Sequence, residues 1–145
     1  MRVETYLKQG YLLDQRINYD LQKLAEMRKA ACGLPGVAIR RDKVQTSPTG
    51  DAPFVQALMR VEEMEAKINR EIDQLVALKE QIREVIQQVD SNELQMVLMY
   101  KYLEGMTEEQ IGEKLYVARP TITRWHRKAI AQITLPEEPI IITKH

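Results

Sequence analysis

Residues 107–126 read TEEQIGEKLYVARPTITRWH, and this stretch decides the fold of the C-terminal part of the chain. Ile111 and Leu115 lie four residues apart, and Ile122 and Trp125 lie three apart. Val117 lies between the two pairs, where a turn is expected. This spacing places them on one face of each of two short helices. Gly112 lies where the helices are expected to cross closely. The stretch therefore predicts a helix-turn-helix with Trp125 in its core.

The flanking residues carry helix-end signals. Thr107 is a favourable N-cap, and Gln110 three residues later completes a capping box. Gly105 is expected to end the preceding helix. That helix is predicted over residues 92–104, with Asp90 as its cap, and it would complete a three-helix core.

The N-terminal part predicts two long helices joined by a loop. Residues 33–53 contain three Gly and three Pro without a helical period, so they predict the loop, and Pro53 suits the first turn of the helix after it. Residues 3–32 predict a helix with these side chains on one face: Tyr6, Gly10, Leu13, Ile17, Leu21, Leu24 and Ala31. Residues 54–89 alternate spacings of four and three along a seam: Phe54, Leu58, Val61, Glu65, Ile68, Ile72, Leu75, Lys79, Ile82, Ile86 and Val89. Such a repeat is typical of a coiled coil.

Two arrangements of this arm satisfy the pattern. The two helices pair within one chain, or the seams of two chains meet across a two-fold axis, and both hold together in a four-helix dimer. Glu65 and Lys79 either interrupt the seam, which we favour because long side chains reach solvent, or pair with the other helix. The predicted organisation is an arm at 1–90, a helix-turn-helix domain at 91–133 and a tail at 134–145. The tail carries three consecutive Ile that favour an extended strand. They pack on the bundle, pair with a partner or stay loose as termini often do, and we favour packing or partner contact because three exposed Ile would be an aggregation hazard.

Composition limits the function classes. The chain has 145 residues with 21 Lys and Arg against 21 Asp and Glu, so a nucleic-acid site must be a local patch. No apolar run approaches the ~20 residues that span a bilayer, and no signal peptide is visible. Cys32 is the single cysteine, and His126 and His145 are expected at the surface, so we expect no metal and no cofactor. The lack of a membrane span and of a signal peptide leads us to expect a soluble intracellular protein. A phosphate loop and a nucleophile motif are also missing, so we expect that the protein is not an enzyme.

The second helix of the motif carries a basic outward face. Because Ile122 and Trp125 point inward, the outward and flanking positions hold Arg119, Pro120, Thr123, Arg124, Arg127 and Lys128. Arg makes bidentate contacts to guanine, and Thr contacts base edges or phosphate. The helix end at Thr107 offers N–H groups to a phosphate. These residues predict contact with double-stranded DNA rather than a merely solvated face.

Residues 93–133 resemble region 4 of the sigma-70 factors of bacterial RNA polymerase. The matching positions are Tyr102, Leu103, Glu104, Gly105, Thr107, Ile111, Gly112, Leu115, Val117, Arg119 and Ile122. With its arm, the whole chain resembles the small phage-encoded late-gene activators of RinA/ArpU type. The resemblance implies DNA contact by Arg119, Pro120, Thr123 and Arg124, RNA polymerase as a candidate partner, and a place at the nucleoid in the bacterial cytoplasm.

The chain departs from that family at several positions. Tyr116 stands where the family has Gly, which costs about 1 kcal/mol if the backbone there needs a positive φ. Ala118 stands where a Ser caps the helix, so about 1 kcal/mol of capping is missing. Pro120 and Thr123 replace polar or charged side chains, so the DNA sequence read need not be a standard −35 element. The chain also lacks the aromatic region that melts promoters.

The sequence thus predicts a DNA-binding phage transcription regulator, expected to be an activator and a homodimer through its arm. A small terminase-like DNA-packaging subunit is the first alternative, because it also joins a DNA-binding helical domain to an oligomerising region. A coiled-coil interaction protein with a vestigial bundle is the second.

Overall fold

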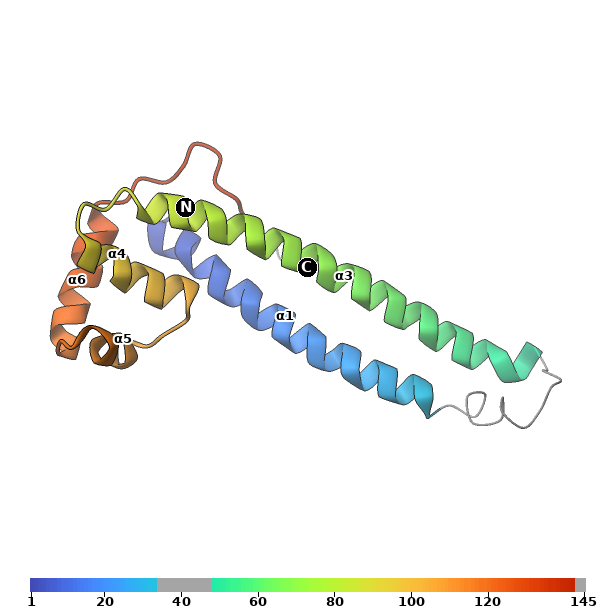
Figure 1. Cartoon of the computed structure of the whole chain (residues 1–145). Coiled ribbons are helices and arrows are strands. Elements are labelled where there is room, and N and C mark those ends of the chain that lie inside the picture. The colour runs from blue at the N-terminus through green and yellow to red at the C-terminus, as the bar shows by residue number, and fades with distance from the viewer. Residues whose placement is uncertain (34–47, 143–145) are drawn as a thin grey trace. The chain divides into compact units, whose positions relative to one another are not determined.

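The computed structural model describes residues 1–33 and 48–142, the side chains of 48–51 excepted. In chain order its helices are α1 (Val3–Cys32), α3 (Pro48–Ile86), α4 (Asn92–Leu98), the π-helix η1 (Met99–Leu103), α5 (Glu108–Leu115) and α6 (Arg119–Ala131) (Figure 1). No strand occurs in these ranges, which confirms the all-α fold. Within the same ranges, no helix combines the length and the apolar character that crossing a membrane requires.

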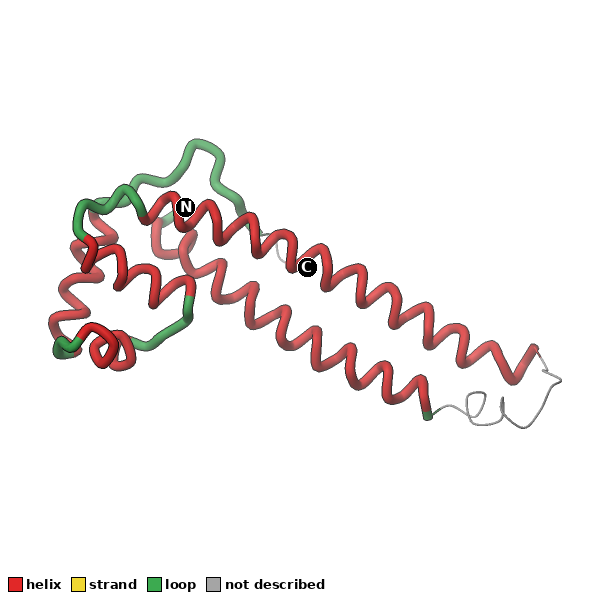
Figure 2. Tube along the Cα trace, in the orientation of Figure 1, coloured by secondary structure: helices red, strands yellow, loops and turns green. Residues whose placement is uncertain are grey.

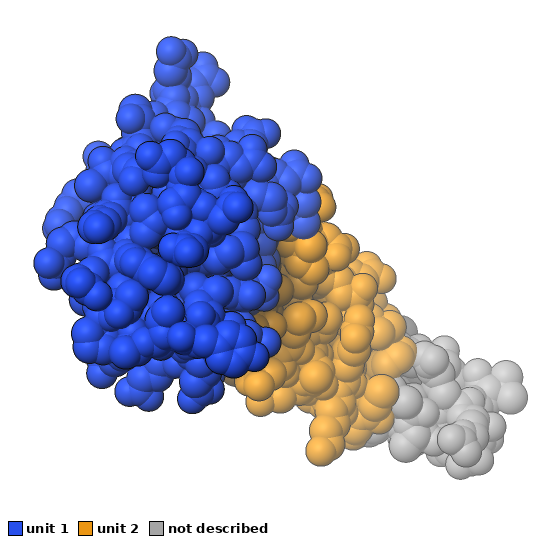
Figure 3. Space-filling model, turned by 60° about the vertical axis from the view of Figure 1, so that its left-hand side comes forward, with its two compact units in different colours: residues 1–14, 74–145 blue, residues 15–73 orange. Residues whose placement is uncertain are grey.

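The chain divides into two compact units (Figure 3). The first comprises Met1–Asp14 and Gln74–His145, and the second comprises Gln15–Asp73. Each long helix therefore contributes one end to each unit. The predicted domains instead followed the order of helices along the chain, with a boundary after residue 90. The units follow packing, because the start of α1 and the end of α3 share a core with the C-terminal helices.

The first unit has one main apolar core. Its buried residues come from α1, α3, the C-terminal helices and the segments just after α3 and α6: Tyr6, Leu7, Leu78, Ile82, Val85, Ile86, Val89, Leu94, Leu98, Tyr102, Ala129 and Ile133. The hydroxyl of Tyr6 donates to Gln81 Oε1 at 2.6 Å, which gives a partner to the polar end of a buried ring. Burial raises the pKa of Tyr6 to about 12.

The C-terminal tail packs on this unit. Ile140 and Ile142 lie against the core, whereas Ile141 is exposed. Gln9 donates to the Ile140 carbonyl at 2.9 Å and accepts from the Ile142 N–H at 2.8 Å. The Ile140 N–H donates to Gln81 at 2.8 Å. The expected packing on the bundle is confirmed, but the chain forms no strand here because glutamine side chains, not a neighbouring backbone, meet its polar groups.

The second unit is an antiparallel helical pair, and Figure 2 shows α1 and α3 running alongside each other in it. Arg16 lies 3.4 Å from Glu71, and Arg28 lies 3.0 Å from Glu65. The later residue of α1 thus pairs with the earlier residue of α3, so the two helices are antiparallel. Glu65 therefore pairs with the other helix, which was the less favoured of its two interpretations. The buried apolar residues of this unit are Ile17, Leu24, Ala31, Val61 and Ile68.

A buried carboxyl pair lies within this apolar interface. Asp20 is 5% exposed and Glu71 is 8% exposed, and Lys67 lies 3.4 Å from Asp20. Burial and the adjacent Asp20 raise the pKa of Glu71 against the opposing effect of nearby cations. Leu21 and Ile72 were predicted on the buried faces but are exposed. The residues just before them, Asp20 and Glu71, are buried in their place, whereas Ile17, Leu24 and Ile68 are buried as predicted.

The second long helix starts earlier and ends earlier than the predicted 54–89. It begins at Pro48, where a missing N–H costs nothing, and it accommodates Pro53 near its start. Of the predicted loop, only 34–47 lies outside the described residues. After Ile86 the chain tightens into i→i+3 hydrogen bonds, which satisfy the last carbonyls and end the α-helix.

The helix predicted over 92–104 changes type midway. It is α-helical to Leu98 and continues as η1, where the Glu104 N–H donates to the Met99 carbonyl five residues back. Gly105 has a φ of 69° and ends the segment, as predicted.

The cap of α4 is Ser91, not the predicted Asp90. Ser91 has extended backbone angles, and its hydroxyl accepts from the Leu94 N–H at 3.5 Å. The Asp90 N–H instead donates to the Gln132 side chain at 3.1 Å, which ties the linker to the end of α6.

Candidate nucleic-acid interface

Helices α5 and α6 meet around a small apolar centre. Ile111 and Ile122 are fully buried there together with Val97 of α4. A methyl group added to Gly112 would come within 2.7 Å of the Val117 carbonyl oxygen, so a side chain at this position would force the turn apart. The predicted helix-turn-helix is present, and Gly112 is required by the turn that follows α5.

The turn between the two helices is strained at Tyr116. This residue has a φ of 58° and a ψ of 42°, the left-handed conformation that glycine adopts most easily. Its side chain is 93% exposed, so packing does not compensate the backbone cost. The strain expected for a residue with a Cβ at this position is therefore found.

Helix α6 begins without a side-chain cap. Ala118 is the N-cap residue, with extended backbone angles and no side-chain hydrogen bond, as predicted. Pro120 lies in the first turn, where the proline ring suits the helix and no N–H is needed.

The outward face of α6 is cationic. Five of its predicted contact residues are exposed: Arg119, Pro120, Arg124, Arg127 and Lys128. Thr123 is half-buried at the side that faces α5. Arg124 donates to the Thr121 hydroxyl at 3.3 Å, an exposed contact on the same helix. Because α6 contains no acidic residue, nothing on the helix itself neutralises this face.

Glu108, in the first turn of α5, contacts Thr123 and Arg119 of α6, which the sequence pattern did not predict. Its Oε2 accepts a hydrogen bond from the Thr123 hydroxyl at 2.7 Å and lies 3.7 Å from Arg119 Nε. Its Oε1 lies 3.5 Å from Lys101 Nζ. The Thr123 bond, followed by the two cations, holds the pKa of Glu108 below its ordinary value although partial burial opposes this. The sequence feature that could have indicated this contact is the pair Glu108 and Glu109 in the first turn of a helix that precedes the basic helix.

Thr107 serves α5 as a cap. Its hydroxyl accepts from the Gln110 N–H at 3.2 Å, and its own N–H donates to the Gln110 side chain at 2.9 Å, which confirms the capping box. These two N–H groups therefore have partners inside the chain, and Glu108 and Glu109 place negative charge at the same helix end. Both facts disfavour the phosphate contact expected there.

His126 is half-buried and does not lie at the surface as predicted. Its Nε2 lies 2.7 Å from the Tyr102 hydroxyl oxygen. Burial, and then Lys101, lower the pKa of His126, while burial raises the pKa of Tyr102. Trp125 packs against both apolar clusters of this unit, as expected for a core residue. His145 lies outside the described residues.

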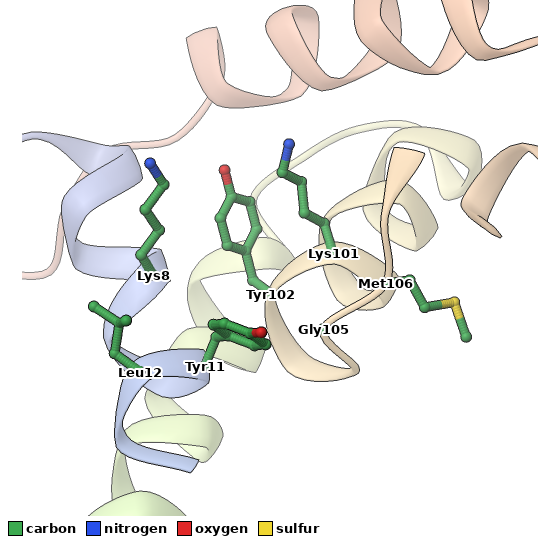
Figure 4. A pocket seen from close by; sticks show the side chains of 7 residues that line it. All are labelled: Lys8, Tyr11, Leu12, Lys101, Tyr102, Gly105 and Met106. Atoms are coloured by element: carbon green, nitrogen blue, oxygen red, sulfur yellow. The ribbon is translucent and has the colours of Figure 1, made fainter. Parts of the chain in front are cut away.

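A shallow pocket of about 330 Å³ lies between α1 and the turn after η1 (Figure 4). It is lined by Lys8, Tyr11, Leu12, Lys101, Tyr102, Gly105 and Met106. The Tyr11 ring lies beside Gly105, and the tips of Lys8, Tyr102 and Lys101 point in a common direction in Figure 4. None of the lining residues belongs to α6, so this pocket is distinct from the cationic face.

The chain was compared with family models, curated proteins and solved structures. A family model described as a protein of unknown function, DUF1492, matches residues 37–134, which include all of α4, η1, α5 and α6. No curated protein and no solved structure matches the chain.

Proposed function

The chain belongs to the DUF1492 family of proteins of unknown function, and from the geometry of α6 we propose that it is a sequence-specific DNA-binding regulator of transcription, acting as an activator. The observation that carries the proposal is the exposed basic face of α6, whose opposite face is anchored by the fully buried Ile122 and Ala129. A helix held in this way presents its basic side chains to the major groove.

Each exposed side chain has a role that fits its chemistry. Arg124 lies in the middle of the face and is suited to bidentate contact with a guanine edge. Arg119, Arg127 and Lys128 lie around it and are suited to phosphate contacts, which position the helix on the duplex. The resemblance to sigma-70 region 4 supports the same orientation, and with it a phage-encoded regulator of RinA/ArpU type that acts at the bacterial nucleoid beside RNA polymerase.

A homodimer is part of the proposal. Leu58 and Ile72 belong to the predicted seam of α3, yet they are 41% and 39% exposed in the single chain. A second copy of the arm would remove these apolar side chains from water. Two copies of α6 would then read two half-sites of one operator.

The test is selection of bound duplexes from random sequence, followed by fluorescence anisotropy on the selected site. Replacing both Arg124 and Arg127 by alanine is expected to weaken binding by about 1–3 kcal/mol for a base-reading arginine, with a shallower salt slope for a phosphate contact. The matched control replaces Arg60 and Arg70, two exposed arginines of α3, and should leave affinity unchanged. Equal affinity of both double variants and the unaltered chain would contradict DNA reading by α6.

A further inference from the structure

We propose that Glu108 fixes the hydrogen-bond polarity of Thr123, so that Thr123 only accepts hydrogen bonds from DNA and selects adenine or cytosine over guanine or thymine on the strand it contacts. The inference rests on the proposed function, because it concerns the same face of α6. It assigns to Glu108 a positioning role and to Thr123 a role in specificity.

The polarity follows from the two groups that surround the Thr123 hydroxyl. Glu108 Oε2 lies at 2.7 Å and the Arg119 carbonyl oxygen lies at 3.2 Å, and both are acceptors. A hydroxyl has one proton to donate, and an ionised carboxylate can only accept. The charged Glu108 carboxylate at 2.7 Å is the stronger acceptor, so it takes the proton and only lone pairs of Thr123 remain for DNA. The neutral Arg119 carbonyl at 3.2 Å, acting alone, would leave the hydroxyl free to turn its proton towards an acceptor on DNA.

The chemistry of the major groove converts this polarity into a base preference. Adenine N6 and cytosine N4 are donors, whereas guanine O6, guanine N7 and thymine O4 are acceptors. If Thr123 can only accept a hydrogen bond, it bonds the amino groups of adenine and cytosine. Opposite guanine or thymine it would place its lone pair against the lone pair of the base. The same reasoning disfavours a phosphate contact, because phosphate oxygens only accept. A threonine with a free proton makes no such distinction.

Glu108 is held in place for this role, and its neighbour is not. The Glu108 side chain is 19% exposed, and Lys101 fixes its second oxygen at 3.5 Å. The Glu109 side chain is 73% exposed and pairs with Arg119 at 3.7 Å. The two residues therefore differ in their relation to Thr123, while each places one negative charge at the start of α5.

The experiment is random-sequence selection with the full chain and its variants. In the unaltered protein we expect one position to favour adenine or cytosine over guanine or thymine by about tenfold. Thr123→Val and Glu108→Ala should each abolish the preference at that same position. Glu108→Asp keeps the charge at the helix start but shortens the reach to Thr123, so it should also lose the preference. Glu109→Ala also removes one negative charge from the start of α5, but this variant should retain the base preference.

The outcomes separate this inference from the proposed function. If no sequence is enriched and the arginine variants bind like the unaltered chain, the proposed function fails. If a sequence is enriched but Glu108→Ala and Glu108→Asp, both folded by circular dichroism, keep every base preference, then the role of Glu108 is overturned while DNA binding stands. A preference for guanine or thymine at the position sensitive to Thr123→Val would equally overturn it.

Discussion

The left-handed backbone conformation of Tyr116 predicts that glycine would be more stable at this position. Its φ of 58° disfavours any residue with a Cβ, and its exposed ring contributes no burial. Tyr116→Gly should therefore raise the free energy of unfolding by about 0.5–1 kcal/mol, after allowance for the larger entropy of an unfolded glycine. Urea denaturation followed by circular dichroism measures this. Tyr116→Ala keeps the Cβ and should gain nothing, so a similar gain from alanine would place the effect in the ring instead.

The buried carboxyl pair makes a prediction about pH. Glu71 faces Asp20 and Arg16 on α1 and Lys67 on its own helix, and its pKa is raised in the folded state. A raised pKa contributes stability that is complete below the unfolded value and is lost as pH rises through the folded value. Glu71→Gln mimics the protonated form, so it should be more stable than the unaltered chain at pH 7, with the difference shrinking towards pH 4.

Chemical denaturation across that pH range tests the sign. Glu62→Gln, an exposed substitution on the same helix, serves as the control and should show no such trend. The deciding quantity is the free energy of unfolding of Glu71→Gln minus that of the unaltered chain. If this difference is negative at pH 7 and rises towards pH 4, the ion pair with Arg16 outweighs the cost of burial.

Residues whose roles depend on spacing within one helix were predictable, and residues whose roles depend on another helix were not. The burial of Ile122 follows from its neighbours in sequence. The partners of His126 and Glu108 are Tyr102 and Thr123, which lie on other helices. Sequence spacing within α5 or α6 carries no information about such pairs.

Among the elements, α6 invites a stabilising change at its start. Ala118 has the backbone angles of an N-cap but no side-chain oxygen. The Thr121 N–H, which donates to the Ala118 carbonyl at 3.0 Å, occupies the position that a capping hydroxyl normally bonds. Ala118→Ser should therefore raise the free energy of unfolding by about 1 kcal/mol. Thermal denaturation by circular dichroism is the measurement. Ala118→Val adds carbon without an acceptor and should not stabilise; if valine raised the melting temperature as much as serine, capping would not be the cause.

The apolar period predicted elements well where the period itself is the cause of folding. The bounds of α1 agree with the predicted 3–32, since a single amphipathic face runs through it. The same period says nothing about η1, because the change from i→i+4 to i→i+5 bonds occurs while the apolar face continues. The early start of α3 depended on Pro48 at a helix N-terminus, a signal that the composition of the predicted loop concealed.

For the whole molecule, the first unit is held together by contacts that helical spacing does not reveal. The hydroxyl of Tyr6 bonds Gln81, and Gln9 bonds the tail at Ile140 and Ile142. These contacts join residues far apart in sequence, so they leave no local pattern. These segments are distant in sequence but share one packed core.

The arm supplies the prediction at this scale. Leu58→Glu with Ile72→Glu places charge on the exposed part of the predicted seam and should convert a dimer of the 16.9 kDa chain into single chains without loss of helix. Light scattering behind a sizing column measures the mass. Met59→Glu with Ala66→Glu adds the same charge at exposed positions off the seam and should leave the dimer intact.

Mass and DNA affinity together decide what the arm is for. If the arm aligns two reading helices on one operator, the seam variant should lose DNA affinity as it loses the dimer, because each half-site then binds alone. A ring of many chains would instead favour a packaging subunit, since an assembly with more copies than half-sites does not fit one operator. A single chain in the unaltered protein, with full affinity for the selected duplex, would leave the exposed seam without this role.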